Sequence, residues 1–145
     1  MRKRTDEQKL DCIKRAISNA QEHMRANDPR SVYSQYVRYA LHEVSDLNFY
    51  TSIEAKGLKR KEVIHEHVVP HGLLLEKLLS LNSLTNENIM AVLQKYYVIC
   101  KITKEEDKRL NSAGFRSKMP EGWTDNDSVF ARYEKVGILI DNGQE

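Results

Sequence analysis

The chain has 145 residues, of which 40% are hydrophobic and 30% are charged, and its formal net charge is +2. These values fit one globular domain and exclude a globally disordered chain, and we expect no secretion signal and no membrane span because no apolar run approaches ~20 residues. The two cysteines, Cys12 and Cys100, lie far apart and outside any metal-binding spacing, which indicates a reducing, cytoplasmic setting.

Two helices are predicted in the N-terminal part of the chain, residues 1–50. Residues 5–26 start with Thr5 as a cap and then carry an apolar stripe at helical spacing: Leu10, Ile13, Ile17, Ala20 and Met24. A second helix is expected over residues 29–44, with Pro29 in its first turn. Its predicted core face consists of Val32, Tyr36, Tyr39, Ala40 and Val44. Tyrosines at this spacing pack in a core more often than they stack on bases.

The central part, residues 62–112, alternates strands with helices. A strand begins at Val63 and runs towards Pro70, after one helical turn expected at 52–55. A buried helix over 73–79, a helix over 86–95 and a β-branched, aromatic strand over 96–102 follow.

Thr103 then caps a helix over 104–112, with Glu106 as its capping-box partner. In the C-terminal extension, residues 113–145, we expect a short helix or turn at 130–133 and a final strand at 136–140. The parts together form a single predicted domain.

Side chains suited to phosphodiester hydrolysis gather on the two strands and the helix over 104–112. Asp107 and Asn111 lie four residues apart and share a helix face, so with Glu66 they offer three oxygen ligands to one cation. Oxygen ligands favour Mg²⁺ or Mn²⁺ over zinc. His67 can take a proton from water because its ordinary pKa lies near neutrality, while the cation stabilises charge on a phosphate.

The stretch Glu66-His67-Val68-Val69-Pro70 resembles the HNH, or ββα-metal (His-Me finger), nuclease superfamily, whose motif places the catalytic histidine after an acidic residue or histidine and shortly before a proline. The second half of that motif, a strand ending in threonine and a helix with ligands four residues apart, matches Ile102-Thr103 followed by Asp107 and Asn111. The resemblance implies an α+β, predominantly helical fold. In it a small antiparallel two-stranded ββα-metal motif lies among N-terminal and inserted helices.

By the same resemblance, Glu66, Asp107 and Asn111 fall at metal-ligand positions and His67 falls at the position of the general base. The chain departs from the family in three ways. The helix ligands are usually histidine, the connection between the strands is longer and helical, and no asparagine occurs at 97–99 to orient the base.

Two functions therefore stay open. The first is a metal-dependent endonuclease that acts on DNA rather than RNA, for which a homodimer would supply the two sites of a double-strand break. The second is a non-catalytic module that binds nucleic acid or another protein through a degenerate version of the fold.

Histidines and basic side chains around the motif are candidate substrate contacts: His65, His71, Lys101, Lys104, Lys108 and Arg132. His65 shares a strand face with His67, since residues two apart on a strand point the same way. Arg132 would either clamp a phosphate bidentately or form a structural salt bridge. An ordinary surface or packing role is the alternative for each of the others.

Overall fold

The computed structural model describes residues 3–141, so residues 1–2 and 142–145, the ends of the predicted domain, lie outside the described part. Helices predominate, and one sheet of four strands is present, which agrees with the broad α+β expectation. The elements in chain order are α1 (Asp6–Arg25), α2 (Arg30–Leu41), the 3₁₀ helix η1 (His42–Val44), β1 (Phe49–Ser52), the 3₁₀ helix η2 (Arg60–Glu62), β2 (Val63–His67), α3 (His71–Leu79), α4 (Asn86–Tyr96), β3 (Ile99–Thr103), α5 (Lys104–Ser112), α6 (Ala131–Val136) and β4 (Ile140–Asp141).

The N-terminal helices form where capping and periodicity predict them. Thr5 caps α1 in a reciprocal capping box with Gln8, and Asn27 leaves the helix at a positive φ of 62°. In α2 the buried face differs from the predicted one and consists of Tyr33, Val37, Ala40 and Leu41. The predicted face and the observed face of α2 both repeat at helical spacing. The observed face is mainly aliphatic and packs inward, so Tyr36 and Tyr39 on the predicted face are exposed.

The sheet has the strand order β2-β3-β1-β4, and thus four strands rather than the two expected. β2 and β4 pair antiparallel with β3 and β1, whereas β1 and β3 are parallel. The strand β1 lies within residues 45–61, for which only a helical turn was expected. Residues remote in the sequence hold β1 in place. The Asn48 side chain donates to carbonyls at the end of α4, and the Asn48 backbone carbonyl accepts from the Ile99 amide.

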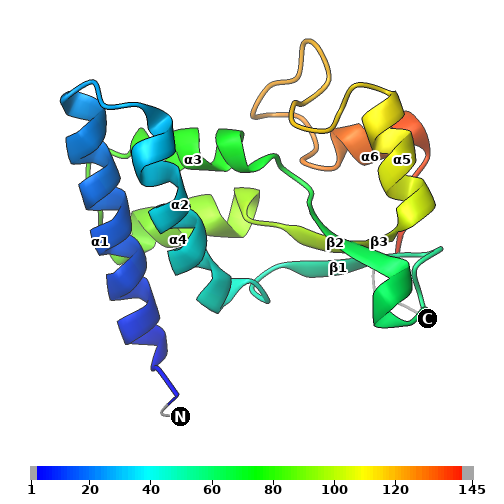
Figure 1. Cartoon of the computed structure of the whole chain (residues 1–145), viewed down its shortest axis with the longest axis horizontal. Helices are drawn as coiled ribbons and strands as arrows, with labels where there is room; N and C mark the ends of the chain where they lie inside the picture. The colour runs from blue at the N-terminus through cyan, green and yellow to red at the C-terminus, as the bar shows by residue number, and fades with distance from the viewer. Residues whose placement is uncertain (1–2, 142–145) are drawn as a thin grey trace.

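The register of β2 against β3 separates the side chains of β2 onto two faces. Glu66 pairs with Cys100 on the face covered by α5 and α6, whereas His67 pairs with Ile99 on the opposite face. Figure 1 shows α1 to α4 gathered at one end of the molecule and α5 and α6 at the other. His67 therefore lies where the sheet meets the four-helix part, and Ile99 belongs to the core of that part.

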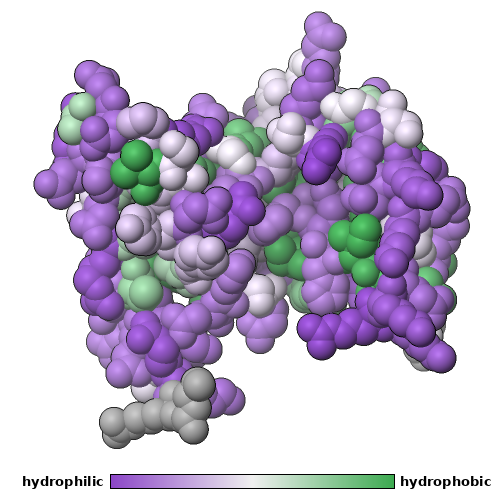
Figure 2. Space-filling view, viewed as in Figure 1, coloured by the Kyte–Doolittle hydropathy of each residue, from purple (hydrophilic) through white to green (hydrophobic). Residues whose placement is uncertain are grey.

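The visible surface is largely hydrophilic, with apolar side chains only in separate small patches (Figure 2). Among residues 3–141 no helix is long and apolar enough to cross a membrane.

Candidate active site at the end of β2

A hollow of about 670 Å³ opens where β2 turns into α3, and we call it the β2–α3 hollow. Histidine and arginine side chains from four parts of the chain line it: Arg38, His65, His67, His71 and Arg116. The Glu66 carboxylate lines it as well, and its charge is paired with the Arg132 guanidinium. Arg38 comes from α2 and Arg116 from the segment after α5, so the hollow combines elements that are remote in sequence. This concentration of cationic and imidazole groups suits an anionic ligand.

Local structure places His67 and His71 beside each other. His67 is the last residue of β2, the turn through Val68 and Val69 is buried, and His71 opens α3 after Pro70. The two ring centroids lie 6.1 Å apart. No side chain caps α3, and Pro70, His71 and Gly72 at its start line the hollow, so the positive end of the helix dipole favours an anion there.

Burial and neighbouring positive charge keep both histidines neutral at pH 7. Burial, followed by the charge of Arg38 and that of His67, lowers the pKa of His71 to about 4. Burial is also the largest cause that lowers the pKa of His67, ahead of Arg38 and His42. A neutral imidazole has one nitrogen that accepts a proton and one that donates a hydrogen bond.

His71 also has unmet hydrogen-bonding capacity. Both of its ring nitrogens are buried without a hydrogen bond, although the Ser34 backbone is near enough to oppose part of the pKa shift. A buried polar group without a partner costs about 1–3 kcal/mol, so His71 lowers the stability of the fold where it stands.

The depressed pKa of His71 predicts a loss of stability in acid. Between pH 6.5, its ordinary pKa, and about 4 the unfolded chain binds the proton that the folded chain rejects, so the free energy of unfolding falls as pH falls. We expect the urea midpoint of the wild type to drop over this range more steeply than that of His71→Asn, which cannot titrate. Parallel curves for the two proteins would show that His71 titrates normally.

Both carboxylate oxygens of Glu66, a predicted metal ligand, accept hydrogen bonds from other side chains of the protein. Its Oε2 lies 2.7 Å from the Arg132 guanidinium, and its Oε1 accepts from the Tyr133 hydroxyl. Arg132 is fully buried and also donates to the carbonyl oxygens of Phe115, His67 and Val68. Arg132 is therefore a structural salt-bridge partner, the second of its two predicted roles, and does not reach the hollow as a phosphate clamp.

The predicted cation does not fit Glu66 in this arrangement, because both carboxylate oxygens are engaged and a guanidinium beside them opposes a second positive charge. Asp107 and Asn111 do lie together on α5, with the Asn111 amide 3.5 Å from the Asp107 carboxylate. Within residues 3–141 no three His, Cys, Asp or Glu side chains form a group that could hold a metal ion. The requirement for Mg²⁺ or Mn²⁺ stays a prediction.

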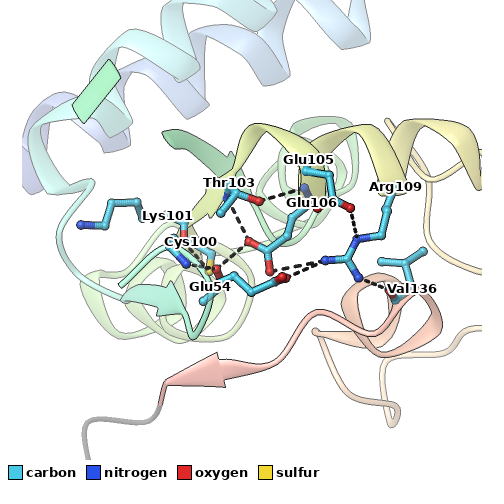
Figure 3. A network of polar contacts seen from close by, with 10 residues as sticks. Glu54, Cys100, Lys101, Thr103, Glu105, Glu106, Arg109 and Val136 are labelled. Carbon is cyan, nitrogen blue, oxygen red and sulfur yellow. Dashed lines mark hydrogen bonds and ion pairs between the residues drawn. The ribbon is translucent and has the colours of Figure 1, made fainter. Parts of the chain in front are cut away.

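A second carboxylate on the side of the sheet covered by α5 and α6, that of Glu106, is also structural (Figure 3). It is fully buried and accepts from the Thr103 amide at 2.9 Å and from the Ser52 hydroxyl at 2.6 Å, which confirms the predicted capping box. Arg109 lies 3.8 Å from its second oxygen. The neighbouring Cys100 is buried, which raises the pKa of its thiol to about 12, so it is no nucleophile at neutral pH.

The three predicted lysines lie on opposite sides of the sheet. Lys101 pairs with His65 in the sheet and shares its face, whereas Lys104 and Lys108 are exposed on α5, over the opposite face. Arg38, which lines the hollow, was not among the predicted site residues. Nothing in its local sequence distinguishes it from any other arginine on the exposed side of a helix.

No protein-family model, curated protein or solved structure matches this chain. The case for a function therefore depends on the side chains of the β2–α3 hollow.

Proposed function

We propose that the protein is a nuclease that hydrolyses phosphodiester bonds, in DNA rather than RNA, within the β2–α3 hollow. The observation that carries this proposal is the pair of histidine rings, His67 and His71, whose centroids lie 6.1 Å apart in a hollow that Arg38 and Arg116 also line. The resemblance of Glu66-His67 and Pro70 to the nuclease motif supports the same position for the general base.

Each lining group has a task in this proposal. Arg38 and Arg116 neutralise the phosphate charge, and the His71 ring packs beside His67 on the wall of the hollow. His67 accepts a proton from a water molecule as the water oxygen bonds to phosphorus. The bond from phosphorus to the leaving nucleoside oxygen breaks, and that oxygen takes a proton from solvent.

A second candidate is a non-catalytic nucleic-acid-binding protein that uses the same hollow. The ion pair of Glu66 with Arg132 favours this non-catalytic candidate, because the Glu66 carboxylate was expected to hold the cation. Both candidates bind phosphate, and they differ in whether the diester bond breaks.

Incubation of the protein with supercoiled plasmid, in Mg²⁺, Mn²⁺ or EDTA, separates the two. We expect conversion to the open circular form, and the EDTA sample tests the predicted metal requirement. A gel shift without nicking in any sample would support the non-catalytic candidate. The absence of both nicking and a gel shift would contradict both proposals.

A further inference from the structure

The face of the sheet that carries His65 continues away from the hollow as an open surface. Phe49 is 43% exposed, although it belongs to a strand, and its ring meets the exposed His65 ring edge to face at 5.3 Å. Lys101 lies on β3, the strand between β1 and β2, where it pairs with His65 on one side and with Thr51 on the other. An exposed aromatic ring, an imidazole and an ammonium group thus share one face.

This surface is continuous with the β2–α3 hollow, because His65 both lines the hollow and contacts Phe49. A phosphate held beside His67 would therefore have its adjoining sugar and base over or near the Phe49 ring. Base–aromatic stacking tolerates every base because each base has a π-face.

We propose that Phe49, His65 and Lys101 form a stacking platform for an unpaired base of single-stranded DNA. The proposal rests on the proposed function for the position of the phosphate. The bases of duplex DNA cannot stack on this platform, because they are stacked on one another and present only their edges.

Charge around the platform favours a polyanion over an apolar protein partner. Lys59, Arg60 and Lys61 are all exposed immediately before β2, and Glu62 is the only acidic side chain of η2. Arg38 and Arg116 line the hollow together with His65, and the Glu66 carboxylate that also lines it is paired with Arg132. Basic groups along a path that also exposes an aromatic ring are the features by which proteins bind single strands.

Fluorescence anisotropy with a short labelled phosphorothioate strand in EDTA tests this proposal without the complication of cleavage. We expect Phe49→Ala to weaken binding of the single strand about tenfold and Phe49→Trp to preserve it. Binding of a duplex of the same sequence, and of an abasic strand of equal length, should be the same for Phe49→Ala and the wild type. Equal affinity of Phe49→Ala and the wild type for the single strand would overturn the proposal, as would an equal loss on the abasic strand.

Tyr36→Ala is the matched control, because Tyr36 is an exposed aromatic residue on α2 that does not line the hollow. It should bind the single strand like the wild type, and thermal melting of all variants checks that they are folded. Cleavage of the same single strand with ordinary phosphodiester linkages, in Mg²⁺ or Mn²⁺, separates this test from that of the proposed function. Binding that depends on Phe49 without cleavage of the strand would support the platform and contradict the nuclease, whereas cleavage with unchanged binding in Phe49→Ala would overturn the platform alone.

Discussion

Replacement of Arg132 by methionine should lower the melting temperature by roughly 10 °C, the largest stability effect that we expect from a single polar side chain. Arg132 is fully buried and forms an ion pair with Glu66 whose closest N–O distance is 2.7 Å. Without it, the Glu66 carboxylate, which is 13% exposed, has lost its counter-ion, and the loss of one partner from a buried pair costs about 3–5 kcal/mol. For a domain of this size 1 kcal/mol corresponds to about 2–4 °C. Thermal denaturation followed by circular dichroism measures the change.

Two variants make this measurement specific. Arg4→Met removes a surface ion pair with Glu43 and should cost less than about 1 kcal/mol. The double variant Arg132→Met with Glu66→Leu removes both charges and should be more stable than Arg132→Met alone. If Arg132→Met melted at the same temperature as Arg4→Met, the buried ion pair would not hold the end of β2 in place.

Replacement of His67 by alanine should reduce the rate of plasmid nicking by about 100-fold or more, the usual contribution of a general base. The affinity for DNA should change little, because Arg38, Arg116 and His71 still line the hollow. Single-turnover cleavage measures the rate, and a gel shift on the same samples measures the affinity. His67 is only half-buried and forms no ion pair, so the variant should remain folded.

Asp107→Ala is the informative control for this experiment. Asp107 is the predicted metal ligand on α5, which covers the face of the sheet opposite His67, and we expect its loss to change the rate by no more than a few-fold. The opposite pattern, with nicking lost in Asp107→Ala and kept in His67→Ala, would indicate that hydrolysis takes place at α5 and not in the hollow.

The elements that the sequence predicts best are those set by neighbouring residues. The helix expected over 104–112 is found as Lys104–Ser112, because Thr103 and Glu106 define its start and Gly114 follows its end. Strands β1 and β4 contain four and two residues, and their pairing depends on partners far along the chain. For that reason β1 was missed, and β4 was expected at residues 136–140 rather than at Ile140–Asp141.

The same distinction holds for the site. His67 and His71 lie within one strand-to-helix turn, and both were candidate site residues, although their pairing was not predicted. Arg132 lies 66 residues from Glu66, and only the fold shows that the two form a buried ion pair. From the sequence Glu66 was predicted only as a metal ligand, and Arg132 was left open between a phosphate clamp and a structural salt bridge.

The central claim is that a phosphodiester lies against His67 and His71, and histidine NMR during titration with a short phosphorothioate strand tests it most directly. The account predicts that the ring resonances of His67 and His71 shift together and that the pKa of each rises, because a nearby negative charge favours the protonated imidazole. His23, which pairs with Asp28 and stacks on Tyr33, should not shift. Saturable binding that leaves the resonances of His67 and His71 unchanged would contradict the account.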